Sequence, residues 1–555
     1  MTPHITLLRQ KLTAFNLDGW LLPHSDRFKG EYLVPCDEWL KWLSNFSGSA
    51  GFSIILKDKA AVFVDGRYTL QAKEQVDQHI FSLNALSDEK KWLSDHGNDH
   101  YKIGFDPWLF SEKEIVAFQK VTRNLEPHPR FLDDLWRDRP VHPKSALFQH
   151  PLMYAGVSTE EKIKNLRALL NEKKVDAVLL FPESWSWLLN LRGGDLSYTP
   201  VSQGFAFITK DRVCLFLYKA DQSFENISIY PLEELEDFLK QHASLTLGYD
   251  PSQTPLSVLN FFSNKVVLED PCLLPKACKN NIELDGAKIA HKKDAVAWCT
   301  FWQNLKAKIH THEKLTELAI VESMLQVRQK QKNFHSLSFA TIAGSGAHGA
   351  IVHYKPETST NRPLGMNELL LIDSGAQYFE GTTDITRTLI IGKPTQEMIF
   401  HYTLVLKGHS AIARAIFPKG TTGAQLDILA RNALWQHKLD YAHGTGHGVG
   451  SFLSVHEGPQ RISKLGHAPL HPGMILSNEP GYYLEGHYGI RLENLIYVKE
   501  IDKGWYGFEN LTLVPFDKNL IGWDMLTSEE IQWVNDYHTL IRDTLKDDAL
   551  LKDLI

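Results

Sequence analysis

Cysteine is scarce in this sequence, and its few cysteines are not arranged for a metal ribbon or a disulfide framework. The 555 residues include five cysteines, an odd number, and no two of them form a CxxC pair. This pattern is typical of reduced thiols in a cytoplasm. It argues against a zinc ribbon and against a small secreted scaffold held by disulfides.

Long apolar runs and clusters of like charge are also missing. No stretch approaches the roughly 18–20 apolar residues that a membrane-spanning helix needs, and the N-terminal segment MTPHITLLRQKL lacks the apolar core of a secretory signal. Lysine and arginine are dispersed, and the net charge of -7 gives no sign of a nucleic-acid-binding surface. We therefore expect a soluble, cytoplasmic protein with no nucleic-acid or membrane partner.

The chain is long enough for about three or four domains. Its N-terminal half contains an internal sequence repeat. The segments ITLLRQKLTAFNLDGWLLP and IKNLRALLNEKKVDAVLLFP align so that Asp18 falls on Asp176. Each copy predicts an amphipathic helix that leads through a short turn into an apolar strand. Such openings are common, so the match could arise by chance. It favours two related α/β domains, residues 1–150 and 151–279, joined by the proline-broken linker RDRPVHPKSALFQHP.

The remaining part, residues 280–555, has a different composition and is expected to form a third domain. A long helix is predicted from near Glu283, and glycine-rich turns then alternate with short strands from about residue 340 to 515. The tail, about residues 515–555, contains LTSEEIQWVNDYHTLIRDTL, which predicts a capped amphipathic helix. Such a helix could pack on its own domain or form a subunit contact.

Two aspartates, Asp373 and Asp384, close apolar runs in the segment LLLIDSGAQYFEGTTDITRTL. A carboxylate at the end of a buried strand is costly unless something pairs with it. A reversal around residues 379–381 would place the two strands side by side, about 4.8 Å apart, so that both carboxylates converge. The simpler alternative is a hairpin whose acids point into water.

The segment HGTGHGVGSFLSVHEGP carries His443, His447 and His456 between glycines. The glycines make a helix unfavourable, and the segment lacks the GK[ST] of a phosphate-binding loop. The glycines more plausibly let the backbone pass close to something, which leaves the imidazoles exposed to it.

Two further segments add carboxylates. LSNEPGYY places Glu479 before a proline, which favours an extended backbone. YGIRLENLIYV, taken as one continuous strand, puts Arg491 and Glu493 on the same face, where they could simply neutralise each other. Together the segments supply four carboxylates and one imidazole, a donor set that suits two hard divalent ions, Mn²⁺ more readily than a thiolate-preferring metal. Two such cations would balance the four carboxylate charges and lower the pKa of a bound water molecule.

The ordered motifs DSGAQYFEGTTDITRT, HGTGHGVG, NEPGYY and RLEN resemble the active-site signature of the pita-bread metallopeptidases, whose fold is creatinase-like and methionine aminopeptidase-like. Within them the chain is similar to the three-domain cytosolic Xaa-Pro aminopeptidases over nearly its whole length, including SNFSGSAG, VDGRYTLQA and AGSGAHGAIVHY. The resemblance implies an α/β and α+β fold with two related creatinase-like N-terminal domains and a C-terminal pita-bread catalytic domain. It also implies removal of the N-terminal residue from peptides with proline in the second position, and a homodimer.

The resemblance implies that the four carboxylates and the imidazole of His447 are metal ligands. Asp373 would hold one metal ion, His447 and Glu479 the other, and Asp384 and Glu493 would bridge both. A hydroxide that bridges the two ions would attack the carbonyl before proline. Mn²⁺ is the expected metal, with Zn²⁺ and Co²⁺ as alternatives.

The resemblance also assigns residues to the substrate. His353 would lie near the scissile peptide, and His443 and His456 would contact the substrate and stabilise the tetrahedral intermediate. Glu479 would take the proton of the attacking water and return it to the leaving nitrogen. Arg491 would brace the two bridging carboxylates from outside.

Two other functions remain open at this point. A prolidase, which cuts dipeptides that end in proline, would share the same metal ligands, and only activity on a tripeptide separates the two. A catalytically silent pita-bread protein used for binding is disfavoured, as is metal-free creatinase-like hydrolysis, because all five ligand residues are present. Methionine aminopeptidase is disfavoured because it would not need such large leading domains.

Overall fold

The computed structural model describes residues 3–98 and 100–555, and the chain divides into two compact units. Unit 1 comprises the residues up to Gln149 together with Ser158–Leu196 and Val201–Cys272. Unit 2 comprises His150–Val157, Ser197–Pro200 and Leu273–Ile555. No helix among the described residues has the length and apolar character that crossing a membrane requires.

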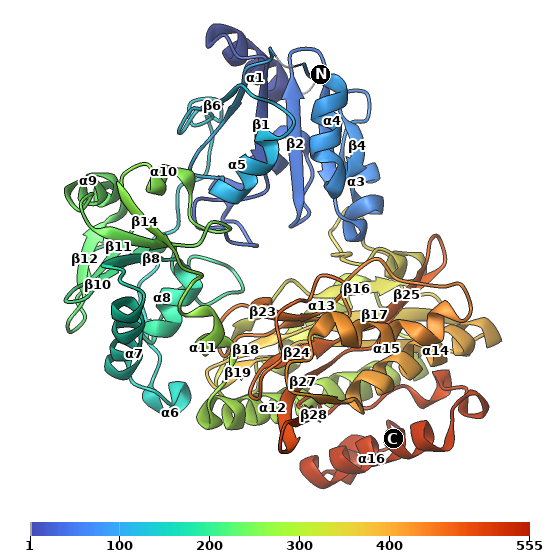
Figure 1. The fold of residues 1–555 in the computed structure, drawn as a ribbon. Helices are drawn as coiled ribbons and strands as arrows, with labels where there is room; N and C mark the ends of the chain where they lie inside the picture. Colours follow the sequence, from blue (N-terminus) through green and yellow to red (C-terminus); the bar gives the residue numbers. More distant parts are fainter. Residues whose placement is uncertain (1–2, 99) are drawn as a thin grey trace. The chain divides into compact units, whose positions relative to one another are not determined.

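Unit 1 is built on two six-stranded sheets with the same strand order, drawn in blue and in green in Figure 1. The first sheet has the order β4 (Ser82–Ala85), β3 (Ala60–Val64), β2 (Gly51–Leu56), β1 (Gly19–Pro23), β5 (Ile103–Phe105), β6 (Leu125–Pro127). The second has the order β12 (Ser228–Pro231), β11 (Val213–Leu217), β10 (Gly204–Thr209), β8 (Ala177–Leu180), β13 (Thr246–Tyr249), β14 (Asn264–Val267). The helices are α1 (Pro3–Ala14), α2 (Trp39–Ser44), α3 (Thr69–Gln75), α4 (Glu89–His96), α5 (Glu112–Gln119), α7 (Thr159–Glu172), α8 (Pro182–Leu188), α9 (Leu235–Gln241) and α10 (Leu256–Leu259).

The internal repeat in the sequence corresponds to a repeated structure. Helices α1 and α7 each lead into the fourth strand of their sheet, β1 or β8, which runs antiparallel to one neighbour and parallel to the other. The aligned aspartates also make equivalent hydrogen bonds to the backbone. Asp18 accepts a hydrogen bond from the N–H of Lys102 at 2.9 Å, and Asp176 accepts one from the N–H of Thr246 at 3.0 Å. Each carboxylate therefore fastens the turn before its strand to the neighbouring parallel strand.

Unit 2 combines one large sheet with three smaller ones. The large sheet has the order β21 (Ile416–Pro418), β28 (Trp505–Asn510), β27 (Asn494–Asp502), β24 (Ile475–Asn478), β22 (Gly446–Gly448), β23 (Glu457–Ile462). The small sheets are β16 (Ile342–Ser345), β17 (Glu368–Ser374), β20 (Ile385–Ile391); β15 (Phe334–Leu337), β18 (Ala376–Tyr378), β19 (Gly381–Thr382); and β25 (Gly481–Leu484), β26 (Tyr488–Arg491). The helices are α6 (Leu152–Ala155), α11 (Leu273–Ala277), α12 (Asn281–His310), α13 (Glu317–Arg328), α14 (Gln396–Ala413), α15 (Gly423–Trp435), α16 (Ser528–Leu545) and α17 (Asp548–Leu551).

The two helices expected at the ends of unit 2 are present. The long helix predicted from near Glu283 is α12, and a capping box formed by Asn280 and Glu283 closes its N-terminus. Thr527 caps the N-terminus of helix α16, and both α16 and α17 contact α12. The hydroxyl of Tyr537 on α16 donates a hydrogen bond to the carbonyl of Val514 at 2.9 Å. Of the two alternatives for the tail helix, packing on its own domain is therefore the one observed.

Candidate metal centre

The hairpin predicted between Asp373 and Asp384 is confirmed. Strand β17 pairs with β20 so that Asp373 lies opposite Thr386, and the chain reverses between β18 and β19, where Tyr378 pairs with Gly381. Asp384 directly precedes β20, and both carboxylates are buried. The backbone pairing of two strands thus fixes the positions of both acids.

Three residues on or beside different strands bring their donor atoms together. Oxygen atoms of Asp384 and Glu493 and a ring nitrogen of His447 all lie within 4.8 Å of one another. Nε2 of His447 is 3.5 Å from Oδ2 of Asp384 and 3.5 Å from Oε1 of Glu479. We call these four residues and Asp373 the carboxylate centre.

The imidazole of His447 is held in one orientation. Its Nδ1 lies 2.9 Å from the carbonyl oxygen of Gly448, which fixes the proton there and turns Nε2 towards the acids. Burial alone would lower the pKa of His447, but the hydrogen bond to Asp384 and the charges of Glu479 and Asp384 raise it to about 9. In the protein without metal, a proton on Nε2 therefore occupies the place that a cation would take.

The donor atoms fit divalent metal ions. Oδ1 of Asp373 and Oδ1 of Asp384 are buried and have no hydrogen-bond partner among the described residues. Burial raises the pKa of Asp373 to about 7, opposed by the charge of Arg491 and reinforced by those of Asp384 and Glu479. Burial, followed by the charges of Asp384 and Glu479, also raises the pKa of Glu493 well above its usual range. Acids crowded in this way, two of them with one unsatisfied oxygen among the described residues, are stabilised by cations, and oxygen donors with one imidazole suit hard divalent ions.

The contacts of Arg491 differ from those predicted. Its Nη2 donates to Oδ2 of Asp373 at 2.7 Å, and its Nε donates to the hydroxyl of Thr386 at 3.2 Å. That hydroxyl in turn donates to Oε2 of Glu493 at 2.8 Å. Arg491 thus braces Asp373 directly and Glu493 through Thr386, and the prediction that it would brace Asp384 is wrong.

The reason lies in the backbone, because the segment YGIRLENLIYV is not one strand. Strand β26 ends at Arg491 and pairs with β25, whereas β27 begins at Asn494 and pairs with β24 and β28. The chain changes sheets between them, so Arg491 and Glu493 do not share the face of a strand. Both still reach Thr386, from different directions.

The three histidines assigned to the substrate lie in three places. His456 lies beside His447, with ring centroids 4.3 Å apart. His443 has Nδ1 2.7 Å from the carbonyl oxygen of Gly444 and Nε2 2.8 Å from the hydroxyl of Tyr483, which also accepts a hydrogen bond from Arg491 at 2.7 Å. Contact between His443 and a substrate would therefore require the Tyr483 hydrogen bond to be exchanged.

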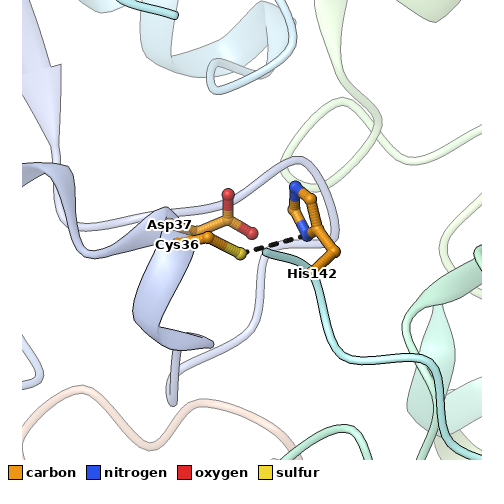
Figure 2. A group of neighbouring side chains, drawn as sticks. All are labelled: Cys36, Asp37 and His142. Atoms are coloured by element: carbon orange, nitrogen blue, oxygen red, sulfur yellow. Dashed lines mark hydrogen bonds between the residues drawn. The ribbon is translucent and has the colours of Figure 1, made fainter. Parts of the chain in front are cut away.

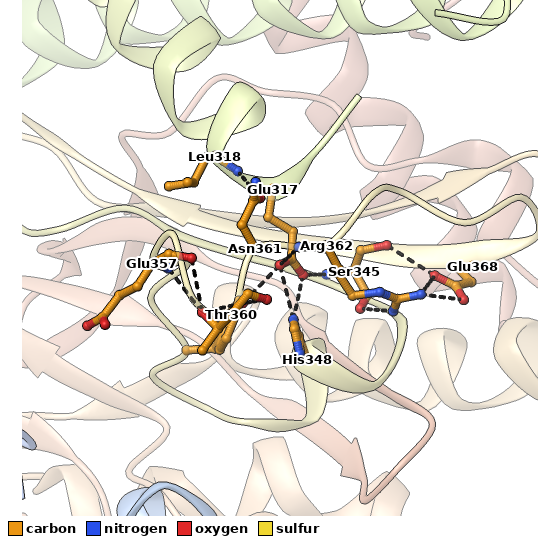
Figure 3. Close-up of polar contacts among 10 residues, drawn as sticks. Glu317, Leu318, Ser345, His348, Glu357, Thr360, Asn361, Arg362 and Glu368 are labelled. Atoms are coloured by element: carbon orange, nitrogen blue, oxygen red, sulfur yellow. Dashed lines mark hydrogen bonds and ion pairs between the residues drawn. The ribbon is translucent and has the colours of Figure 1, made fainter. Parts of the chain in front are cut away.

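His353 lies in the turn that follows the 3-10 helix η5 (Gly346–Ala350), on a loop whose two ends are fastened by one carboxylate. Figure 3 shows this carboxylate, that of Glu317, with Ser345, His348 and Arg362 around it. Glu317 is fully buried and accepts hydrogen bonds from the N–H of Ser345 at 2.9 Å and from the N–H of Arg362 at 3.3 Å. Nδ1 of His348 lies 2.9 Å from the same carboxylate. Glu317 therefore ties together both ends of the loop that carries His353.

Two residues of this arrangement were not singled out from the sequence. Tyr483, which joins Arg491 to His443, lies within the NEPGYY motif, so a signal for it was present. Glu317 has no comparable signal. It is the first residue of α13, where an acidic residue is expected simply from the helix dipole.

Models of known families match the chain in four consecutive segments. Residues 5–133 and residues 138–283 each match the Creatinase/Prolidase N-terminal domain. Residues 285–500 match Metallopeptidase family M24, and residues 504–553 match the C-terminal region of peptidase_M24.

Similar proteins match over almost their whole length. The chain is 37% identical to "Probable Xaa-Pro aminopeptidase P" of Coprinopsis cinerea, over 96% of this chain and 93% of that protein. It is 34% identical to "Aminopeptidase P2" of Arabidopsis thaliana, over 94% of this chain and 82% of that protein. Among solved structures, the X-prolyl aminopeptidase of Caenorhabditis elegans, described as a cytosolic enzyme with a di-nuclear active site, superposes with a TM-score of 0.94. It is 32% identical, with 100% of this chain and 97% of that chain covered.

Proposed function

The chain belongs to the Xaa-Pro aminopeptidase P group of the M24 metallopeptidases, and we propose that it removes the N-terminal residue from peptides whose second residue is proline. The predicted fold is confirmed: two creatinase-like N-terminal domains precede a catalytic domain of the pita-bread type. The chain is an enzyme, a metal-dependent peptide hydrolase.

The convergence of donor atoms at the carboxylate centre is the observation that carries this proposal. In our assignment two divalent ions are held by Asp373, Asp384, His447, Glu479 and Glu493. The buried Oδ1 atoms of Asp373 and Asp384, which have no partner in the described part of the chain, support this assignment, as does the fixed tautomer of His447. Mn²⁺ is the metal we propose, because oxygen donors predominate and no sulfur is present.

The chemistry can be assigned to particular side chains. Two bound divalent ions supply a Lewis acid and lower the pKa of water into the neutral range. Glu479 then accepts the proton of the attacking water and returns it to the proline nitrogen as the peptide bond breaks. His456, beside His447, donates to the carbonyl oxygen as negative charge develops there, and His443 and His353 hold the substrate backbone. Arg491 keeps Asp373 in place throughout, through the 2.7 Å hydrogen bond to its carboxylate.

Domain limits, location and oligomeric state are also part of the proposal. We propose the domain limits 1–150, 151–279 and 280–555. Separate matches of two N-terminal family models support two N-terminal domains, but they meet between residues 133 and 138, which favours a first boundary earlier than residue 150. We propose a cytoplasmic location, supported by the description of the nematode relative as a cytosolic enzyme. We also propose a homodimer, which sedimentation of the purified protein would test.

One titration tests the function. Purified protein stripped of metal is titrated with Mn²⁺ while cleavage of Arg-Pro-Pro and of Ala-Pro is followed in parallel. Metal-dependent release of arginine from the tripeptide is the expected result. Cleavage of the dipeptide alone would identify a prolidase instead, and silence on both substrates with metal bound would leave only a binding function.

A further inference from the structure

A second group of metal-ligating side chains lies in unit 1, away from the carboxylate centre in the sequence. Cys36, Asp37 and His142 each place one ligand atom within 4.8 Å of the others. Figure 2 shows the three side chains facing one another, and Sγ of Cys36 lies 3.2 Å from Nδ1 of His142. We call these three residues the cysteine cluster. It contains the sulfur donor that the carboxylate centre lacks.

The three ligands come from two segments that are distant in the sequence. Cys36 and Asp37 lie on the short 3-10 helix η1 (Pro35–Asp37), and both are buried. His142 is partly exposed and lies in the proline-broken linker that the sequence predicts between the two N-terminal domains. A cation bound here would therefore fasten the linker to the first domain.

Outer contacts already orient each ligand. Nε2 of His142 lies 3.3 Å from the hydroxyl of Tyr218, and the two rings stack with centroids 4.2 Å apart. A proton on Nε2 leaves the lone pair of Nδ1 directed at the sulfur, which is the arrangement found around histidine ligands. Arg139 donates to Oδ1 of Asp37 at 2.9 Å and to the carbonyl of Cys36 at 2.6 Å. Because a carboxylate has two oxygens, the hydrogen bond from Arg139 to Oδ1 still allows Asp37 to coordinate an ion through its other oxygen.

A cavity also adjoins the cluster. Its volume is about 350 Å³, and it is lined by His142, Tyr218 and Arg139, among others. The cavity reaches the cluster at His142, and a water molecule there would serve as a fourth ligand. Three protein ligands with a fourth open position is a common coordination for Zn²⁺.

We propose that Cys36, Asp37 and His142 form a binding site for a thiophilic divalent cation, with Zn²⁺ as the ion that the donor set favours. Binding converts the Cys36 thiol to a thiolate and releases one proton to solvent, so that thiolate and carboxylate together balance the two positive charges. A mixed sulfur, nitrogen and oxygen donor set of this kind selects against Mn²⁺, which prefers oxygen ligands. The site is separate from catalysis and ties the linker to η1.

Cobalt provides the test, because a thiolate bound to Co²⁺ gives a near-ultraviolet charge-transfer band that oxygen and nitrogen ligands do not give. The full-length protein is stripped of metal and titrated with Co²⁺ in the presence of a reductant that does not bind metals. We expect the band to appear in the wild-type protein and to be absent in Cys36→Ser. His142→Ala should raise the Co²⁺ concentration needed for the band by at least about tenfold.

Cys214→Ser is the matched control, because Cys214 is another buried thiol of unit 1 and no other metal-ligating group is found with it among the described residues. Its band should equal that of the wild type, and circular dichroism checks that each variant is folded. Absence of the band in the wild type would overturn the proposal, as would a band that survives Cys36→Ser or one that His142→Ala leaves unchanged. The carboxylate centre has no cysteine, so loss of peptidase activity would not alter this result.

Discussion

The carboxylate centre and the cysteine cluster differ in how their ligands are satisfied without a metal. At the carboxylate centre, one oxygen each of Asp373 and Asp384 is buried with no partner among the described residues. In the cysteine cluster, Cys36 and His142 are within hydrogen-bond distance of each other. Burial of an unpaired carboxylate costs several kcal/mol, on the order of 1–3 for the lost hydrogen bond alone and more for a charge. The first site therefore depends on a cation, whereas the second is stable with or without one.

The supporting backbone differs as well. The ligands of the carboxylate centre lie on or beside paired strands, which fix their positions through ladders of backbone hydrogen bonds. Those of the cysteine cluster lie on one 3-10 turn and on a linker. A site on paired strands keeps its geometry during a reaction. An ion bound on a linker instead restricts the motion of the linker and stabilises the folded state, as expected for a structural cross-link.

The largest effect is expected when Asp384, an acid with one oxygen that lacks a partner among the described residues, is neutralised. Asp384→Asn keeps the shape of the side chain but removes the charge that two cations would share. We expect cleavage of Arg-Pro-Pro to fall by about a thousandfold or more, which corresponds to about 4 kcal/mol of transition-state stabilisation, and metal content measured by mass spectrometry to fall with it. The matched control is Asp285→Asn, an exposed acid on α12, which should keep full activity. Normal metal content and activity in Asp384→Asn would show that Asp384 is not a metal ligand.

A smaller effect is expected from the residue that braces the acids. Arg491→Lys keeps the positive charge but cannot hold Asp373, Thr386 and Tyr483 at once, because an ammonium lacks the planar fork of a guanidinium. We expect Mn²⁺ affinity to fall by roughly 10- to 100-fold, measured as the Mn²⁺ concentration that restores half of the activity. Arg542→Lys, an exposed position on α16, is the control. An unchanged Mn²⁺ requirement in Arg491→Lys would show that the charge alone suffices.

Much of this arrangement follows from local sequence, and the rest does not. The hairpin of Asp373 and Asp384 was predictable because apolar strands and an intervening turn lie within one short segment. The partners of Arg491 were not, because the chain changes sheets at residues 492–493 and strand periodicity stops there. Likewise, nothing in the local pattern brings His142 to Cys36, because a contact across about a hundred residues depends on how the linker packs.

In the fold, too, some features could be predicted from local sequence and others could not. The repeat in unit 1 was visible because a helix, a turn and a strand recur with an aspartate at the same place, and both aspartates make the same contact. The order of six strands in each sheet was not predictable from that repeat. It depends on pairings between strands that are distant in the chain, such as β8 with β13. Tertiary packing decides such pairings, not the local propensity of either strand.

A moderate effect is expected at the loop that carries His353. Glu317→Gln retains an acceptor but weakens the charge-assisted hydrogen bonds from Ser345 and Arg362 that fasten both ends of the loop. We expect kcat/KM for Arg-Pro-Pro to fall roughly tenfold, or about 1.4 kcal/mol, with metal content unchanged. Glu322→Gln, an exposed glutamate on the same helix, should be neutral. Loss of metal in Glu317→Gln would instead place its effect on the carboxylate centre.

The smallest expected effect, a roughly twofold change in the alkylation rate at a Zn²⁺ concentration equal to its Kd, distinguishes the two sites by the metal that each prefers. Cys36 is fully buried, so a thiol reagent reaches it only after local opening. Zn²⁺ at a free concentration equal to its Kd should halve the rate of Cys36 alkylation, because half of the clusters then hold the ion, and a tenfold excess should slow it roughly elevenfold. Mn²⁺ at the concentration that restores peptidase activity should leave the rate unchanged. Mass spectrometry follows each cysteine separately, with Cys214 as the internal control. Equal protection by Mn²⁺ would show that the two sites do not differ in metal preference, and equal protection of Cys214 would show that Zn²⁺ acts on unit 1 as a whole.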